Sequence, residues 1–400
     1  MTNNKKIFFY FLTFLLFFII FEVTLNILKI RPNNSNYGWL NAHDTYNNLV
    51  EEITVNEFGT RDTKIKNIKK KNIILLGDSQ VELAQKKTKM PARILEKHLK
   101  QNYNVYSLGS WGWGTDQQLL ILINSIKKIK PKYVIVFFTP NDLTDNYHNI
   151  GFKGEKPTFK INKEGQLIKP TNTYFKKLLN YSWTYRFFYR LKIFYKNRNQ
   201  KNFLTEESFK KRNECSNDNI FDLKKLIVNK VDYEWYMQKY ITQSKNNKNI
   251  SSQKELIEKN YYKFFDKRNN YELETDRGYD YFRDIRTDIE NEKILLTNKL
   301  LREIQKESNN NNAEMYLVNI INFNYLFKEN IEYKICINNK EVIYSNQNYY
   351  KTFKDIFEGI NNIINFSIER GTIDYDPNDG HLNFEMNNKL FKKVSEYLQK

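Results

Sequence analysis

Residues 72–79 read Asn-Ile-Ile-Leu-Leu-Gly-Asp-Ser, and this stretch decides the fold expected for the chain. Four consecutive aliphatic residues before a glycine predict a strand buried on both faces, as in a parallel sheet. The glycine allows a sharp turn, so Ser79 is expected at the carboxyl end of the strand, near the start of the next helix. Ligands bind at that edge of open α/β sheets. Ser79 is therefore a candidate nucleophile, and the competing interpretation is a helix-capping serine.

The same alternation of strand and helix continues along the chain and returns near its end. Buried strands are predicted at residues 105–108, 133–138 and 315–320, and helices at 91–100, 116–128, 285–304, 355–368 and 390–398. Strands that alternate with helices in this way predict an α/β fold with a parallel sheet and right-handed crossovers.

Four hundred residues exceed one typical domain, so a large domain with an insertion, or two domains, is expected. The segments are 1–30, an N-terminal anchor helix; 31–150, the first half of the α/β core; 151–282, an insertion rich in Lys, Asn and aromatic residues; and 283–400, the second half of the core. The insertion is predicted to be mostly helical.

The N-terminal segment is apolar enough to enter a membrane. Lys5 and Lys6 precede fifteen uncharged residues, 7–21, and the apolar character continues past Glu22 to about residue 28. A cleaved signal peptide is the alternative, but no Ala-x-Ala-like site follows, and the first alanine is Ala42. We expect an uncleaved signal anchor with its basic end in the cytoplasm and the remainder of the chain outside it.

The formal charge of +18 does not by itself predict a nucleic-acid partner. Lysine is scattered among asparagine, without a dense basic tract or a nucleic-acid motif. No Cys/His cluster has zinc-ligand spacing, so neither a metal nor another cofactor is expected. The metal-dependent alternative would use the three carboxylates of Asp78, Asp142 and Asp379.

The loop just before the closing helix contains the best candidate for a base. His381 follows a stretch of Pro, Gly and Asx residues, and a histidine there could face the sheet edge that carries Ser79. Serine attack on an acyl carbonyl needs a base with a pKa near ~7, which histidine supplies. A carboxylate would orient the imidazole, and Asp379 and Asp376 are the two candidates.

Donors for the negative charge that develops on a substrate oxygen follow the second and third strands. Gly112 lies in a glycine-rich turn, where a backbone N–H can approach closely. Asn141 could offer its side-chain amide. Because carboxyl ends of parallel strands share one edge, Ser79, Gly112, Asn141 and His381 are expected to converge.

Together, Gly77-Asp78-Ser79, Gly112, Asn141-Asp142 and the late Asp-Gly-His resemble the four blocks of the SGNH (GDSL-type) hydrolase family. The resemblance covers residues 54–150 and 284–398. It includes an Asn-x-x-Gly-x-Arg lead-in at residues 56–61, which is similar to that of membrane-associated members.

The resemblance implies a flavodoxin-like three-layer α/β/α sandwich. It also implies a nucleophile, Ser79, a general base, His381, and an oxyanion hole formed by the N–H groups of Ser79 and Gly112 with the Asn141 amide. Asp78, Asp142 and Asp376 are taken as supporting residues.

The chain departs from the family pattern at three positions. Thr139 replaces a glycine two residues before Asn141, and Met386 replaces a glycine after the histidine. Asn378 occupies the usual position of the acid, three residues before His381. The acid is therefore Asp379, or Asp376, or it is absent and a Ser-His dyad acts alone.

The expected function is that of a serine esterase or O-acyltransferase that forms an acyl-serine intermediate. The expected substrate is an acylated small molecule, or an extracytoplasmic glycan or lipid that carries ester-linked acyl groups. A non-catalytic envelope protein that binds glycan on the same fold is the alternative. The sequence does not indicate the oligomeric state.

Overall fold

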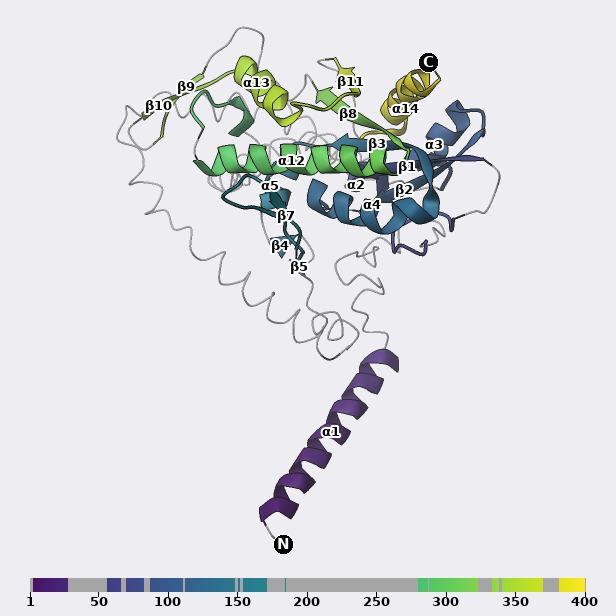
Figure 1. Cartoon of the computed structure of the whole chain (residues 1–400), viewed down its shortest axis with the longest axis vertical. Coiled ribbons are helices and arrows are strands. Elements are labelled where there is room, and N and C mark those ends of the chain that lie inside the picture. The colour runs from purple at the N-terminus through teal and green to yellow at the C-terminus, as the bar shows by residue number, and fades with distance from the viewer. Residues whose placement is uncertain are drawn as a thin grey trace, which may run out of the picture.

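A five-stranded parallel sheet forms the centre of the protein in the computed structural model (Figure 1). The structure describes residues 3–27, 56–65, 70–82, 87–110, 112–147, 150–151, 154–170, 184, 280–286, 288–322, 333–337, 340–369 and 381–399. The strands of the sheet are β1 (Lys71–Gly77), β2 (Tyr103–Gly109), β3 (Pro131–Phe138), β8 (Glu314–Asn322) and β11 (Ile363–Ile368). Every neighbouring pair is parallel, which confirms the predicted α/β class.

The strand order is β11-β8-β3-β1-β2, so the chain changes direction beside β1. It passes from β1 outward to β2, returns across β1 to β3, and continues outward to β8 and β11. In open α/β sheets, ligands bind at a reversal of this kind, outside the carboxyl ends of the two strands beside it, which here are β1 and β3. Asp78 follows β1 and Thr139 follows β3 at this point.

Helices cover both faces of the sheet, since successive residues of β1 point to opposite sides. Ile73 and Leu75 pack with α3 (Pro91–His98) and α14 (Phe384–Leu398). Ile74 and Leu76 lie in a second cluster with α4 (Thr115–Ile129), α12 (Asp288–Asn310) and α13 (Asn346–Ile356) (Figure 1). All four aliphatic side chains are fully buried. Burial of such a side chain contributes about 1.5–3 kcal/mol.

The prediction of a helix over residues 355–368 is wrong. Helix α13 ends at Ile356, and a turn containing Gly359, at φ +78°, separates it from β11. In β11, Ile364, Phe366 and Ile368 are buried while the residues between them are more exposed. This period of two is that of a strand, and it was hidden by the helical pattern of the preceding residues.

The remaining described elements are short. They are α2 (Ser79–Glu82), η1 (Lys87–Lys89), α5 (Asp142–Tyr147), β4 (Ile150–Gly151), β5 (Gly154–Glu155), β6 (Lys160–Ile161), β7 (Leu167–Ile168), η2 (Asp280–Phe282), β9 (Tyr333–Ile337) and β10 (Lys340–Tyr344). The pairs β4–β5, β6–β7 and β9–β10 are antiparallel. The described start of the predicted insertion is thus built from short strands; residues 171–279, apart from Thr184, lie outside the described part of the chain.

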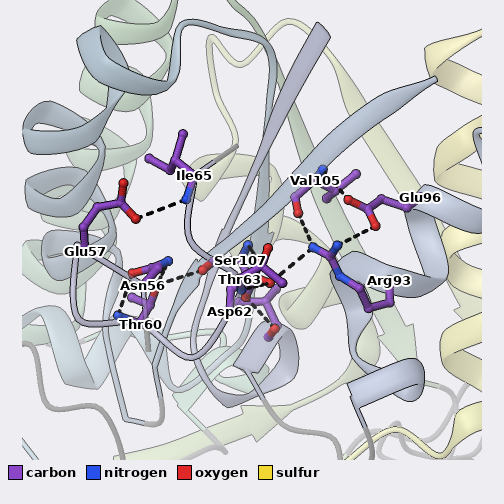
Figure 2. A network of polar contacts seen from close by, with 11 residues as sticks. Asn56, Glu57, Thr60, Asp62, Thr63, Ile65, Arg93, Glu96, Val105 and Ser107 are labelled. Atoms are coloured by element: carbon purple, nitrogen blue, oxygen red, sulfur yellow. Dashed lines mark hydrogen bonds and ion pairs between the residues drawn. The ribbon is translucent and has the colours of Figure 1, made fainter. Parts of the chain in front are cut away.

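The lead-in segment folds into a compact loop against the outer edge of β2. The side-chain oxygen of Asn56 accepts from the N–H groups of Phe58 and Thr60, at 3.0 and 3.1 Å. Thr60 Oγ1 then donates to the Ser107 carbonyl at 2.9 Å, and Asp62 Oδ2 accepts from the Ser107 N–H at 2.6 Å (Figure 2). Thr60 of the lead-in and Asp62, which directly follows it, therefore occupy the backbone groups of Ser107 that an additional strand would otherwise bind.

Helix α3 completes the cover of the same edge. Arg93 Nη2 donates to the Val105 carbonyl at 2.5 Å, and Glu96 Oε1 accepts from the Val105 N–H at 3.0 Å. Arg93 also pairs with Asp62, at 3.2 Å between Nη2 and Oδ1, so the helix and the lead-in are joined (Figure 2). Open strand edges recruit other chains, and here side chains satisfy the edge instead.

Helix α1 (Asn3–Ile27) contains an 18-residue window, Phe8–Leu25, that is long and apolar enough to cross a membrane. Most of its large apolar side chains are exposed. Glu22, the acidic residue within the apolar run, accepts hydrogen bonds from the N–H and hydroxyl of Thr184, at 2.8 and 2.7 Å.

Candidate active site

Ser79 is the first residue of α2, directly after the strand end predicted from the sequence. The residue is buried, with 6% of its surface exposed. Among the described residues, its hydroxyl has no hydrogen-bond partner. Within the described part of the chain, the Ser79 hydroxyl at this strand end does not cap its own helix.

Asp78 lies fully buried behind the nucleophile candidate and accepts hydrogen bonds on both carboxylate oxygens. Its Oδ1 accepts from the Gln80 N–H at 2.9 Å. Its Oδ2 accepts from Thr139 Oγ1 at 3.1 Å and is 3.5 Å from Asn141 Nδ2. Burial raises the pKa of Asp78 above its ordinary value, while these donors and the positive charge of His381 act to lower it.

His381 reaches the same sheet edge from the other end of the sequence, since its charge acts on Asp78. An interaction that lowers the pKa of a fully buried carboxyl requires the imidazole to lie nearby. The start of α14 fixes the chain just beyond it: Asn383 caps the helix by accepting from the Met386 N–H at 2.9 Å, and Asn387 Nδ2 donates to the Leu382 carbonyl at 2.7 Å. The influence on Asp78 thus places His381 near the residue before Ser79, and a contact between His381 and Ser79 stays a prediction.

Gly112 lies in a tight turn in which the Trp113 N–H donates to the Ser110 carbonyl at 3.0 Å. Its φ of +72° belongs to the left-handed region, which explains why a glycine is present here. Trp113 and Ser110 are buried, so the turn is fixed on both sides of Gly112.

The Asn141 amide is held by two carboxylates at the start of α5. Its Nδ2 donates to Asp145 Oδ2 at 2.9 Å and lies 3.5 Å from Asp78 Oδ2. An amide nitrogen has two hydrogens, so both are directed at protein oxygens in this arrangement. The longer contact is the weaker one, and it is the one that a substrate oxygen would replace.

Asp142 is fully buried, and its environment favours the neutral acid. Burial, followed by the charges of Asp78 and Asp145, raises its pKa well above the ordinary value. Its Oδ2 accepts from Thr115 Oγ1 at 3.2 Å. Two adjacent buried carboxyls resist simultaneous ionisation, and of the two Asp78 is the one with donors on both oxygens.

Three further residues join this region that the sequence reasoning did not single out as functional. Lys156 forms a buried ion pair with Asp116 at the start of α4, and burial raises the pKa of Asp116 to about 6 even with the lysine present. Asn146 accepts from the Asp116 N–H at 3.1 Å and donates to Thr297 on α12 at 3.0 Å. Only the position of Asp116 in the first turn of a predicted helix signalled a polar role; nothing local marks Lys156 or Asn146.

The two candidate acids, Asp379 and Asp376, lie outside the described residues, as does Asn378. Within the described ranges no group of three or more His, Cys, Asp or Glu side chains could hold a metal ion. The metal-dependent alternative needed Asp379 as its third ligand.

No protein-family model matches this chain, and no curated protein matches it. The resemblance to SGNH hydrolases accordingly depends on the residues quoted above and on where the fold brings them.

Proposed function

We propose that this protein is a serine esterase or O-acyltransferase of the SGNH (GDSL-type) hydrolase family, with a flavodoxin-like three-layer α/β/α sandwich. One observation carries the proposal: Ser79 begins a helix at the carboxyl edge of β1, beside a buried Asp78 that interacts with the charge of His381. These residues are separated by about three hundred positions in the sequence. The strand order supports the proposed fold, because it is the doubly wound order with a reversal beside the first strand.

The first half-reaction forms a covalent intermediate. His381 takes the proton of Ser79 as Oγ attacks the acyl carbonyl, and the developing oxyanion accepts from the N–H groups of Ser79 and Gly112 and from the Asn141 amide. The C–O bond to the leaving alcohol then breaks, and the alcohol takes the proton from His381. This leaves an acyl ester on Ser79.

The second half-reaction reverses these steps with a new acceptor. His381 removes a proton from water, or from an acceptor hydroxyl, which attacks the acyl-Ser79 carbonyl. Collapse breaks the bond to Ser79 and returns the proton to Oγ. In this scheme Asp379 or Asp376 stabilises the imidazolium, or the Ser-His dyad acts alone. Hydrolysis and transfer differ only in the acceptor.

The side of the membrane on which the α/β core would lie supports an envelope glycan or lipid as the substrate. A chain anchored through α1, with Lys5 and Lys6 in the cytoplasm, would present the α/β core outside the cytoplasm. An O-acylated envelope glycan or lipid is the substrate class within reach there. A C-terminal reporter that is active only outside the cytoplasm tests this orientation.

A non-catalytic glycan-binding protein on the same fold is the second candidate. The observation in its favour is the Asn141 amide, whose two hydrogens both face carboxylates. In that case the candidate site would bind a glycan without attacking it.

The deciding experiment labels the detergent-solubilised full chain with a serine-directed fluorophosphonate. Labelling of the parent is expected, with loss in Ser79→Ala and strong slowing in His381→Ala. Ser125→Ala serves as the control. Ser125 lies about 15 Å along α4 from its start at Thr115, and its hydroxyl donates to the Ile121 carbonyl of the same helix, away from the candidate site. An unlabelled parent would exclude the enzyme and favour the binding protein. Product analysis with an acetyl ester, with and without an oligosaccharide acceptor, separates hydrolysis from transfer.

A further inference from the structure

Thr139 departs from the family pattern and contacts the candidate active site directly. It follows β3, the strand beside β1, and only 8% of its surface is exposed. Its hydroxyl donates to Asp78 Oδ2 at 3.1 Å. A glycine, which the family pattern has here, lacks any side chain to make this bond. The contact is therefore a feature of this chain's own sequence.

The importance of the bond follows from the surroundings of Asp78. A fully buried carboxylate needs donors on both oxygens, because water cannot solvate it. The Gln80 N–H donates to Oδ1. Of the two described donors to Oδ2, the Thr139 hydroxyl makes the shorter hydrogen bond. The other donor, Asn141, is 3.5 Å away and is bonded more closely to Asp145.

Charged and titratable groups face Asp78 from two sides. His381, from the segment before α14, acts to lower the pKa of Asp78, and Asp142, from α5, lies close as a buried acid. Asp145, also on α5, reaches it through the Asn141 amide. The hydroxyl of Thr139 adds a fixed dipole among these groups without adding charge.

We propose that Thr139 is a positioning residue for the reaction of Ser79. Its hydroxyl holds the Asp78 carboxylate ionised and directed, so that the Asn141 amide can leave Asp78 for the substrate oxyanion. The held carboxylate also keeps a negative charge beside the imidazolium of His381. This inference rests on the proposed function.

Replacement of Thr139 by valine tests the role with little change in shape. In Thr139→Val, Oδ2 of Asp78 retains only the Asn141 amide as a described donor. The amide is then recruited to Asp78 and withdrawn from the oxyanion, and Asp78 is protonated at a higher pH. Thr139→Ser restores the hydroxyl and should restore both properties.

The experiment measures the rate of fluorophosphonate labelling of Ser79 against pH, on the full chain in detergent. Thr139→Val is expected to label about tenfold more slowly, with the acid limb of its profile moved to higher pH, as loss of a hydrogen bond to a charged group predicts. Thr139→Ser should follow the parent within about twofold, and the Ser125→Ala control should leave the profile unshifted.

A second readout does not depend on activity. Loss of the Thr139 hydroxyl raises the pKa of Asp78 further above its unfolded value, so the stability that this group contributes at low pH is lost more completely as the pH rises. The difference in unfolding temperature between the parent and Thr139→Val should therefore widen from pH 5 to pH 8, while that of Ser125→Ala stays constant.

The outcomes separate the two proposals. An unlabelled parent refutes the proposed function, and the unfolding temperatures then decide alone whether Thr139 fixes Asp78. A labelled parent with an unshifted Thr139→Val profile, or an unfolding difference that does not change with pH, overturns the role of Thr139.

Discussion

Gly77 of β1 and Gly109 of β2 lie opposite one another in register at the carboxyl ends of the two strands, and Val81 of α2 packs over both. A Cβ on Gly109 would lie 2.1 Å from Val81 Cγ2 and 2.6 Å from the Gly77 carbonyl oxygen. Paired glycines thus let the first turn of α2 settle directly on the strand ends. This close approach fixes the position of Ser79, two residues before Val81.

Gly109→Ala is expected to lower the free energy of unfolding by about 3 kcal/mol, since a backbone oxygen and a buried side chain both block the added methyl. Gly77→Ala should lower the free energy of unfolding by about 1 kcal/mol, because the atoms nearest to the added Cβ would lie 3.0–3.3 Å from it. Urea unfolding gives the values, and fluorophosphonate labelling reports whether Ser79 has moved.

The comparison for this series is Gly165→Ala, which has φ +74° and no neighbour within 4 Å, so it loses about 1 kcal/mol through backbone strain alone. Gly77 and Gly109 are not among the glycines with positive φ, so their cost is steric. Val81→Ala should rescue Gly109→Ala only in part, since the Gly77 oxygen remains. Equal stability of Gly109→Ala and Gly165→Ala would contradict the packing described here.

The buried pair of Lys156 and Asp116 predicts a pH-dependent loss of stability. Lys156→Met leaves the Asp116 carboxylate buried without its cation, so its pKa rises beyond about 6. A carboxyl with a raised folded pKa favours folding at low pH and loses that contribution as the pH rises. We expect a deficit of about 3 kcal/mol at pH 8 and a much smaller one at pH 5.

Thermal unfolding at the two pH values measures this deficit. The matched variant is Lys156→Met combined with Asp116→Asn, which removes the titrating group and should show the same deficit at both pH values. A deficit of Lys156→Met that does not depend on pH would mean that Asp116 is not the residue responsible.

Most of the sheet was predictable because β1, β3 and β8 carry apolar runs that are buried between the two layers of helices. Burial on both faces leaves a continuous hydrophobic run, as at Ile73 to Leu76, and the predicted strands at 105–108, 133–138 and 315–320 all lie within observed strands. The edge strand β11 was missed because it is buried on alternate residues and follows a helix directly. Its preceding turn depends on Gly359 alone, which is a weak signal in a sequence.

The candidate site was predictable where residues follow strand ends, because topology brings those ends together. This applies to Ser79 and Asn141, which follow the ends of β1 and β3. The convergence of Gly112 and His381 with Ser79 stays a prediction. The polar residues behind them were not predictable, since contacts such as Thr139 with Asp78 and Lys156 with Asp116 join segments with no shared pattern. The identity of the acid stays a prediction, because Asp379 and Asp376 lie outside the described residues.

The cover on the edge of β2 predicts that Asp62 is a major stabilising residue. Asp62→Ala removes the acceptor of the buried Ser107 N–H and a partner of Arg93, so about 3 kcal/mol should be lost. Asp62→Asn keeps an oxygen acceptor and should lose less stability.

The control for Asp62 is Glu303→Ala, which removes a surface ion pair with Lys306 and should change the free energy of unfolding by under about 0.5 kcal/mol. If Asp62→Ala matches that control in urea unfolding, the edge does not need its side-chain cover.

Helix α1 predicts that the full chain resists extraction from membranes by alkaline carbonate. Leu16→Lys with Phe17→Lys places two charges at the centre of the Phe8–Leu25 window, where each costs about 3 kcal/mol, and should move the protein to the soluble fraction. Val23→Lys with Thr24→Lys adds the same charge near the end of the window, where lysine side chains reach the interface, so this variant should stay in the membrane fraction. If carbonate extracted the parent itself, net charge and not α1 would hold the chain at the membrane surface. Retention of the parent and of the second variant, with loss of the first, requires α1 to lie within the apolar layer.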